Sequence, residues 1–366
     1  MSASSTISNI LERDTKHRIA RIFFMYSVLI LSIFTTACSN TSEQQISKIS
    51  GPTMGTQYHI SWVSNKQDSH DLALEAKAIQ DQVDQLLIAF NKSMSTYDPQ
   101  SELSLLNHNF KLGWQEISED LYTVLQMSLD INKQSNKAFD VTVGPLVNLW
   151  GFGPDKRQFQ APSQQDIDAL LGQVGSEALE LRTTENGLFQ LRLKQARYID
   201  LSAIAKGYAV DVLGILLQNQ GIDQYLVEVG GEIIANGVKP KQQPWRIAIE
   251  APNDDGRSIQ IIIPLSNMGV ATSGDYRNFF EQEGHRFSHT IDGRTGKPVE
   301  HNLASVSVLH ESVGMADAWA TALTVLGAAE GLALAEKYGL AAYFIVRTEG
   351  GYQQISSSQF EQLRLN

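Results

Sequence analysis

The sequence of 366 residues contains one cysteine, Cys38, so an intramolecular disulfide is impossible. Motifs of several common chemistries are also absent. No GxGxxG follows a predicted strand, and GxxxxGK(S/T), CxxC, HExxH and GxSxG do not occur. These absences argue against a Rossmann or P-loop nucleotide site, a structural or protease-type zinc site, and an α/β-hydrolase nucleophile. Any nucleotide or metal chemistry must therefore rest on other patterns.

Basic residues are also in short supply. There are 29 Lys and Arg against 40 Asp and Glu, which gives a formal net charge of -11 at pH 7. An acidic protein has no field that attracts DNA or RNA, so we expect no nucleic-acid partner. Hydrophobic residues make up 42% and charged residues 19%, which is ordinary for a globular protein. The length allows one large domain or two closely packed ones.

The N-terminus has the pattern of an export signal. Basic residues up to Arg21 precede an apolar run, 22–34, which is shorter than the roughly 20 residues of a typical spanning helix. Small residues at 35–37 then lead into Cys38, where a bacterial lipoprotein carries its lipidated cysteine. The pattern resembles a lipobox, although Thr35 stands where leucine is commonest. The alternative is a short membrane anchor with an incidental cysteine.

We therefore predict a lipoprotein signal peptide over 1–37, with Cys38 as the lipidation site. The polar segment 38–50 lacks periodicity and is predicted to be a flexible tether, followed by one functional domain over 51–366. Under either alternative the domain is held at the membrane and faces the periplasm. Ser39 after the cysteine favours the outer membrane over the inner one.

Strand and helix patterns alternate along the domain without a strict βαβ rhythm. The mixture predicts an α+β fold with mixed sheets flanked by helices. Helices are predicted over 72–90, after Ser118, after Ser163, and over 203–218, 315–326 and 328–337. Strands are predicted over 54–63, 189–193, 197–201, 225–229, 245–250, 259–264, 304–309 and 341–347.

Two segments have residues suited to a nucleotide. In 136–153 a buried-strand pattern ends in a loop of glycines and aromatic residues, which allows close backbone approach and stacking on a planar ligand. In 200–211 a predicted strand joins a helix start, where free N–H groups suit phosphate oxygens and Lys206 adds positive charge. Taken alone, each is equally explained by core packing or by a capped helix.

Two further segments have residues suited to catalysis. Polar, basic and glycine residues gather in 271–278 and 288–298, where His289 is a candidate general base and Arg277 a candidate for stabilising charge. Asp317 and Thr321 are four residues apart on a predicted helix, so their oxygens face the same way. With a backbone carbonyl they would form the hard-oxygen set that Mg²⁺ prefers. A structural histidine and a capping aspartate are the alternatives.

Taken together and in order, these segments resemble the ApbE family of FAD:protein FMN transferases over residues 51 to about 350. The resemblance rests on seven motifs: MGT at 54–56, STY at 95–97, AFDVTVGP at 138–145, DLSAIAKGYA at 200–209, TSG at 272–274, SHTIDGRTG at 288–296 and ADAW at 316–319. It also accords with a lipoprotein leader.

The resemblance implies a role for individual residues. The positions that would contact FAD are Met54, Tyr97, Ala138, Phe139, Asp140, Asp200, Lys206 and Ile291. The positions that would hold Mg²⁺ are the carbonyl of Ala203 and the side chains of Asp317 and Thr321. Some members carry an aspartate just before the threonine, where this chain has Ala320, so a two-metal site is not predicted.

The implied reaction transfers FMN from FAD to a threonine or serine hydroxyl of another protein and releases AMP, with Mg²⁺ neutralising charge on the phosphates. The implied acceptors are flavoprotein subunits of Na⁺-pumping or Rnf-type electron-transport complexes. Two alternatives stay open. One is an FAD pyrophosphatase that yields free FMN and AMP, and the other is a flavin-binding lipoprotein without activity. The pair Asp317 and Thr321 speaks against the last, because binding a flavin needs no metal.

Overall fold

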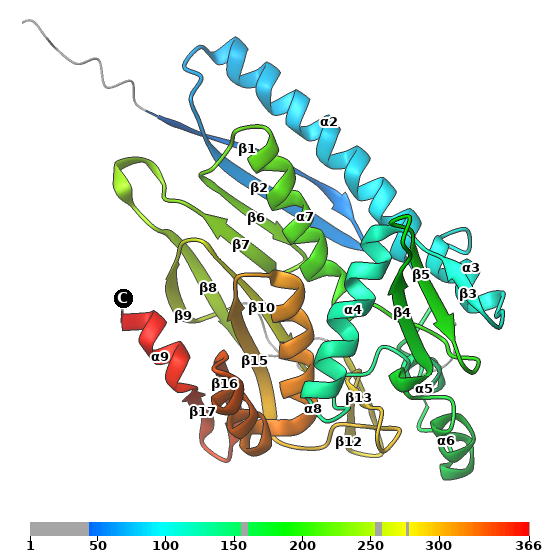
Figure 1. The fold of residues 1–366 in the computed structure, drawn as a ribbon. Helices are drawn as coiled ribbons and strands as arrows, with labels where there is room; N and C mark the ends of the chain where they lie inside the picture. Colours follow the sequence, from blue (N-terminus) through cyan, green and yellow to red (C-terminus); the bar gives the residue numbers. More distant parts are fainter. Residues whose placement is uncertain (1–43, 155–159, 253–257, 276–277, 366) are drawn as a thin grey trace, which may run out of the picture. The chain divides into compact units, whose positions relative to one another are not determined.

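The computed structural model describes residues 44–154, 160–252, 258–275 and 278–365. A central antiparallel sheet of eight strands dominates this part of the chain (Figure 1). Its strands, in spatial order, are β1 (Gln45–Thr53), β2 (Thr56–Ser64), β6 (Tyr225–Val229), β7 (Glu232–Asn236), β10 (Met268–Gly274), β15 (Leu303–His310), β16 (Ala341–Thr348) and β17 (Gly351–Ser356). The sheet is the frame on which the site is built.

Four long helices cover one face of the sheet: α2 (Ser69–Met94), α4 (Glu119–Gln134), α7 (Ala205–Asn219) and α8 (Val313–Tyr338) (Figure 1). Between helices and sheet lies the larger hydrophobic core, which includes Trp62, Phe139, Trp319 and Phe344. By length and composition α8 alone among the described helices could cross a membrane. Its apolar residues are largely buried in this core, which explains that composition.

A second core lies on the opposite face of the sheet. Here the hairpin of β8 (Trp245–Ala251) and β9 (Ser258–Leu265), together with α9 (Ser358–Leu365), packs on the sheet through residues such as Trp245 and Phe360. The smaller elements are α3 (Glu102–His108), β3 (Trp114–Glu116), α5 (Gly144–Leu149), α6 (Gln164–Leu171), β4 (Leu179–Thr183), β5 (Phe189–Leu193), β11 (Phe279–Gln282), β12 (His285–Ser288), β13 (Ile291–Asp292) and β14 (Lys297–Pro298), with two 3-10 turns at Ser176–Ala178 and Pro240–Gln242. Antiparallel sheets and unevenly placed helices confirm the predicted α+β class.

Several local predictions are confirmed. Ser118 caps α4 by accepting a hydrogen bond from the N–H of Leu121, and Ser163 caps α6 through that of Asp166. The two helices predicted on either side of Gly327 are the two halves of α8, which is broken there by a glycine with φ of 75°. His301 lies at this break, with its Nε2 2.7 Å from the carbonyl oxygen of Thr324.

Other local predictions are wrong. Met54 and Gly55 form the turn of the β1–β2 hairpin, with φ of 47° and 71°, and do not begin a strand. Residues 45–50, predicted as part of a flexible tether, belong to β1. Their polar composition concealed the strand pattern of alternating side chains. The signal peptide 1–37 and Cys38 lie outside the described residues.

Two predicted strands are also absent. Residues 197–201 are irregular, because their backbone is bound elsewhere: Ile199 by the side chain of Asn107, and the N–H of Asp200 by the carbonyl of Val141. The buried-strand pattern in 136–153 does not form a strand: residues 138–142 are a series of turns, and α5 follows them where a loop of glycines and aromatic residues was predicted.

Candidate active site

Two adjoining cavities lie on the helical side of the sheet. The Met54 lobe, of about 870 Å³, is bounded by the β1–β2 turn, the C-terminal end of α2 and the start of α7. The Asp317 lobe, of about 390 Å³, extends from it toward α8 and β10. Both volumes are in the range of small-molecule sites. The lobes share Tyr97, Ser202 and Lys206, so a ligand with two bulky halves can occupy both.

The residues predicted from the sequence gather around these lobes. Met54 lines the first, and Tyr97 and Lys206 line both. The Asp317 lobe is lined by Ala138, Phe139, Asp140, Asp200, Ala203, His289, Ile291, Asp317 and Thr321. The structure thus brings segments up to 267 positions apart, from Met54 to Thr321, to one place. Arg277 lies outside the described residues.

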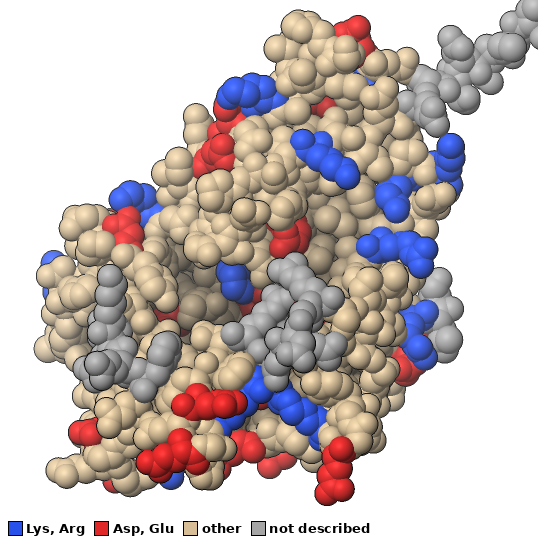
Figure 2. Space-filling view, turned by 180° about the vertical axis from the view of Figure 1, so that it is seen from behind, with Lys and Arg blue, Asp and Glu red and all other residues tan. Residues whose placement is uncertain are grey.

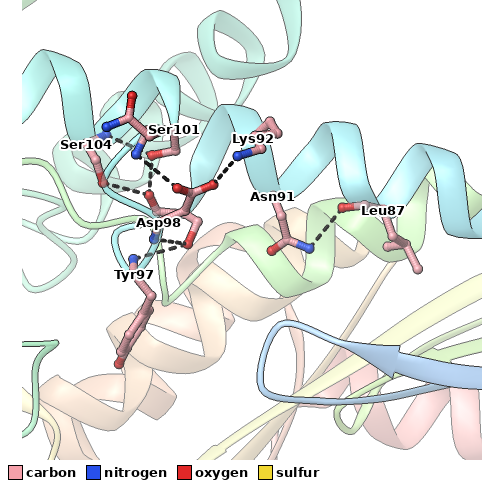
Figure 3. A network of polar contacts seen from close by, with 9 residues as sticks. Leu87, Asn91, Lys92, Tyr97, Asp98, Ser101 and Ser104 are labelled. Atoms are coloured by element: carbon pink, nitrogen blue, oxygen red, sulfur yellow. Dashed lines mark hydrogen bonds and ion pairs between the residues drawn. The ribbon is translucent and has the colours of Figure 1, made fainter.

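Tyr97 stands on a loop that a polar network holds in shape. The hydroxyl of Ser95 accepts hydrogen bonds from the N–H groups of Tyr97 and Asp98, both at 3.1 Å. Lys92 pairs with Asp98 at 2.7 Å, and this pairing lowers the pKa of Asp98. Figure 3 shows the Tyr97 ring pointing away from the network. Tyr97 is 70% exposed, so its ring is accessible for stacking on a planar ligand.

Helices α7 and α8 cap each other where the lobes end. The N–H of Gly207, in the first turn of α7, donates to Asp317 Oδ2 of α8 at 3.1 Å. In return Asp211 of α7 accepts from the N–H groups of Val313 and Gly314 at the start of α8. Each carboxylate lies at the positive end of the other helix dipole. The hydrogen bond from Gly207 therefore orients the carboxylate of Asp317 toward the start of α7.

Gly207 is required by this close approach. A Cβ at that position would lie 2.4 Å from the carbonyl oxygen of Val313 and 2.8 Å from the Cβ of Asp317. Any larger residue would push the two helices apart and move Asp317. The glycine in the AKGYA motif thus has a packing reason that the sequence pattern alone did not give.

A buried charge cluster joins the two lobes. Lys206 Nζ lies 2.6 Å from Glu232 Oε1 and 3.8 Å from Asp317 Oδ2. Burial alone would lower the pKa of Lys206, but the two carboxylates raise it above its usual value, so the ammonium stays charged. Burial, with help from Asp317, raises the pKa of Glu232 against the opposing effect of Lys206. Figure 2 shows a hollow with a basic side chain and acidic side chains at its floor.

Glu232 is a site residue that the sequence prediction missed. It begins β7 directly after the two-residue turn Gly230–Gly231, and only 3% of it is exposed. An acidic residue at the buried start of a strand is rare without a partner, and that is the signal that would have identified it.

The carboxylate of Asp140 is taken up by hydrogen bonds within the protein. Its carboxylate accepts from Asn132, from the N–H and hydroxyl of Thr142, and from the N–H and hydroxyl of Ser176, at 2.5–3.1 Å. Five donors leave it no capacity to bind a ligand strongly through its side chain. Asp140 lines the lobe, but its carboxylate holds the loop that carries Ala138 and Phe139.

His289 is oriented as a base. Its Nδ1 lies 3.0 Å from the carbonyl oxygen of Asn278. A carbonyl only accepts, so Nδ1 carries the proton and the lone pair of the neutral ring is on Nε2. Burial lowers the pKa of His289, which keeps the ring neutral near pH 7. Phe152 contacts the ring edge-on, with centroids 6.3 Å apart.

The predicted metal ligands are compatible with a hard cation. Asp317 is 4% exposed, and its Oδ1 receives no hydrogen bond from the described residues. Thr321 lines the same lobe, as does Ala203 in the turn before α7, whereas the neighbouring Ala320 is buried in the core. No group of three or more His, Cys, Asp or Glu able to hold a metal occurs in the described ranges. The set therefore offers one carboxylate, which accords with a single ion that keeps further oxygen ligands from substrate or water.

The fold and site define an α+β protein with a two-lobed cavity and a charged junction. A family model described as the ApbE family matches residues 54–344, and the chain belongs to this family. The FAD:protein FMN transferase of Vibrio cholerae is 42% identical over 335 residues, covering 92% of this chain and 96% of that protein. That of Haemophilus influenzae is 40% identical, covering 91% and 95%.

Solved structures agree with this assignment. The flavin transferase ApbE from Vibrio cholerae is similar with a TM-score of 0.78 at 41% identity, covering 87% of this chain and 99% of that one. The apo form of the flavinyl transferase ApbE from Pseudomonas stutzeri has a TM-score of 0.78 at 37% identity, covering 89% and 98%. The expected ApbE-like fold is confirmed.

Proposed function

We propose that this chain is an FAD:protein FMN transferase. The observation that carries the proposal is the pair of lobes joined at Lys206, in a chain that matches enzymes of this name over nearly its whole length. FAD consists of two nucleotide halves joined by a diphosphate. The halves would occupy the two lobes, and the diphosphate would lie at the junction beside the ammonium of Lys206 and the positive end of the α7 dipole.

The chemical step is a phosphoryl-type transfer. A threonine or serine hydroxyl of the acceptor attacks the phosphorus of the FMN half and forms a new P–O bond. The bond from that phosphorus to the oxygen of the AMP phosphate breaks, and AMP leaves. The hydroxyl proton passes to Nε2 of His289. The rest of the chain contributes mainly by positioning the reactants and by electrostatics.

Magnesium is part of the proposal. Asp317, Thr321 and the carbonyl of Ala203 would hold it. When bound, it would neutralise charge on the phosphate oxygens as the leaving group departs. The acceptors would be flavoprotein subunits of Na⁺-pumping or Rnf-type electron-transport complexes, as the family resemblance implies.

One experiment tests the proposed activity against its alternatives. The protein is mixed with FAD, Mg²⁺ and a purified flavoprotein subunit of a Na⁺-pumping complex, then separated on a denaturing gel under ultraviolet light. A fluorescent acceptor band is expected. Free FMN without a labelled band would instead indicate a pyrophosphatase, and unchanged FAD would indicate a binding protein.

We expect Tyr97→Ala to weaken FAD binding about tenfold or more, because stacking on an aromatic ring contributes ~1–3 kcal/mol per base. The Ser95 network does not involve the ring, so the melting temperature should change little. FAD titration monitored by absorbance gives the affinity. Tyr97→Phe keeps the ring and serves as the control. Unchanged affinity in a folded Tyr97→Ala protein would remove Tyr97 from the flavin site.

The membrane location is a separate proposal. We propose that Cys38 is lipidated, which would anchor the domain at the periplasmic face of a membrane, with Ser39 favouring the outer one. Cys38→Ala should release the protein from the membrane fraction while FMN transfer in vitro stays at the parent level. Fractionation followed by immunoblotting measures this. Unaltered partitioning would show that the apolar segment 22–34 is itself the anchor.

A further inference from the structure

The central sheet has a gap beside the Asp317 lobe. Strands β6 and β7 form a short hairpin whose turn, Gly230–Gly231, has two positive φ angles, 59° and 106°. On one side β10 continues past this turn to Gly274, although its pairing with β7 ends at Val270. On the other side β2 begins at Thr56, level with the turn, and the carbonyl of Gln57 accepts a hydrogen bond from the N–H of Gly230 at 3.1 Å. This gap, between 56–57 and 272–274 with 230–232 at its base, is termed the notch.

The β10 edge of the notch has main-chain groups that face no strand among the described residues. The N–H of Asp275 donates to the carbonyl of Ala304, its opposite residue on β15. In an antiparallel pair such bonds alternate along the strand. The main-chain groups of Thr272 and Gly274 therefore point away from β15, into the notch. An open strand edge of this kind is the usual place where an extended peptide adds to a sheet.

The notch opens into the active site. It holds a cavity of about 620 Å³, which shares Gly230, Glu232, Thr272 and Gly274 with the Asp317 lobe. A chain lying along β10 in this cavity would pass directly beside the charged junction. The two glycines carry no side chain, and a Cβ at Gly231 would meet no atom within 4 Å, so the base of the notch is open.

The charge of the notch selects a ligand with hydrogen-bond donors. Glu232 directs Oε1 to Lys206, while its Oε2 is buried and has no partner among the described residues. Glu228, whose oxygens pair with His59 and with the N–H of Gly231, and Glu250 also line the cavity. The negative charge of the three carboxylates disfavours the phosphates of a nucleotide, and Oε2 of Glu232 favours an N–H group or a basic side chain.

We propose that the notch binds the acceptor segment that carries the hydroxyl, in an extended conformation, as an added strand against Thr272–Gly274. This rests on the proposed transferase function, which requires a polypeptide to reach a site whose two lobes FAD fills. Main-chain pairing with β10 fixes the direction of the segment, and the shared wall at Glu232 brings the hydroxyl to the junction.

The test uses Gln57, which is exposed on β2 and lines the notch but neither lobe. Gln57→Trp should fill the notch and reduce FMN transfer to the acceptor subunit at least about tenfold at subsaturating acceptor, as loss of one well-buried contact does. FAD affinity and melting temperature should stay at the parent values. Lys48→Trp, on the exposed face of β1 and away from all three cavities, is the matched control and should transfer FMN normally.

A photo-crosslinking amino acid at position 57 gives a second measurement, which does not depend on whether Gln57→Trp folds. It should crosslink to the acceptor subunit, and the same group at position 48 should not. Normal transfer by Gln57→Trp, equal loss of FAD binding and transfer, or equal crosslinking at both positions would overturn the notch proposal. A parent protein that labels no acceptor would instead overturn the transferase function itself, so the two failures are distinguishable.

Discussion

Asp317→Asn is expected to reduce FMN transfer roughly 10³-fold while the protein still folds and binds FAD. The magnitude follows if charge neutralisation by the metal lowers the barrier by about 4 kcal/mol, at ~1.4 kcal/mol for each factor of ten. Asparagine keeps a side-chain oxygen for the N–H of Gly207, so the cap on α7 persists. FAD binding, which depends mostly on stacking and backbone contacts, should weaken much less than transfer.

The reciprocal cap supplies the control for this experiment. Asp211→Asn makes the same substitution in the carboxylate that caps α8, and Asp211 lines neither lobe. This variant should have a lower melting temperature, because both carboxylate oxygens of Asp211 accept hydrogen bonds from α8 and asparagine has only one oxygen. Its FMN transfer should stay near the parent level. Thr321→Val should give transfer between the parent and Asp317→Asn.

Metal removal completes the comparison. Chelator treatment of the parent should reproduce the effect of Asp317→Asn, and added Mg²⁺ should reverse it. The measurement is the rate of acceptor labelling in metal-depleted buffer. If Asp317→Asn labels the acceptor at nearly the parent rate there, the metal is held elsewhere or the reaction does not need one, and Asp317 is only a cap.

Local physics made some elements predictable from the sequence. Ser118 and Ser163 have side chains that satisfy free N–H groups at helix starts, so they mark helices reliably. Gly327 interrupts a long apolar helix, and the structure has its break there. In these places short-range chemistry decides the structure, and no distant contact overrides it.

The wrong predictions share a different cause. Residues 197–201 have a strand pattern, yet the side chain of Asn107 and the carbonyl of Val141 take up their hydrogen bonds. The segment around Asp140 has a buried-strand pattern, but the carboxylate collects five donors from three segments of the chain. In both segments the sequence pattern correctly predicted that the side chains are buried. It could not predict the hydrogen-bond partners, because these are set by tertiary contacts.

Residues that line the two lobes were predicted where family motifs cover them, and Glu232, outside those motifs, was missed. Asp317 and Thr321 were paired from helical spacing, and the structure has both on α8 lining one lobe. Glu232 was overlooked because its importance comes from Lys206, 26 positions away in the sequence. The notch is beyond sequence analysis as well, since it arises because β10 extends past the turn that joins β6 and β7.

His289→Ala is expected to lower transfer by about 10²–10⁴-fold, the usual contribution of a general base, without loss of FAD affinity. The ring lines the Asp317 lobe, and the Asn278 carbonyl holds the proton on Nδ1, which leaves Nε2 to accept the hydroxyl proton. Alanine removes the base and leaves the backbone bond between His289 and Asn278 intact. His285→Ala, an exposed position on the same hairpin, is the matched control and should transfer normally.

The pH profile separates a base from a merely structural histidine. A base acts only when neutral, and burial lowers the pKa of His289 below its ordinary value of 6.5. The parent should therefore keep its transfer rate from pH 8 down to about 6.5 and lose it below that value, as the ring becomes protonated. In His289→Ala this acidic limb should disappear, and added imidazole should restore part of the rate. If the limb persists unchanged in His289→Ala, another group accepts the proton and His289 only packs against Phe152.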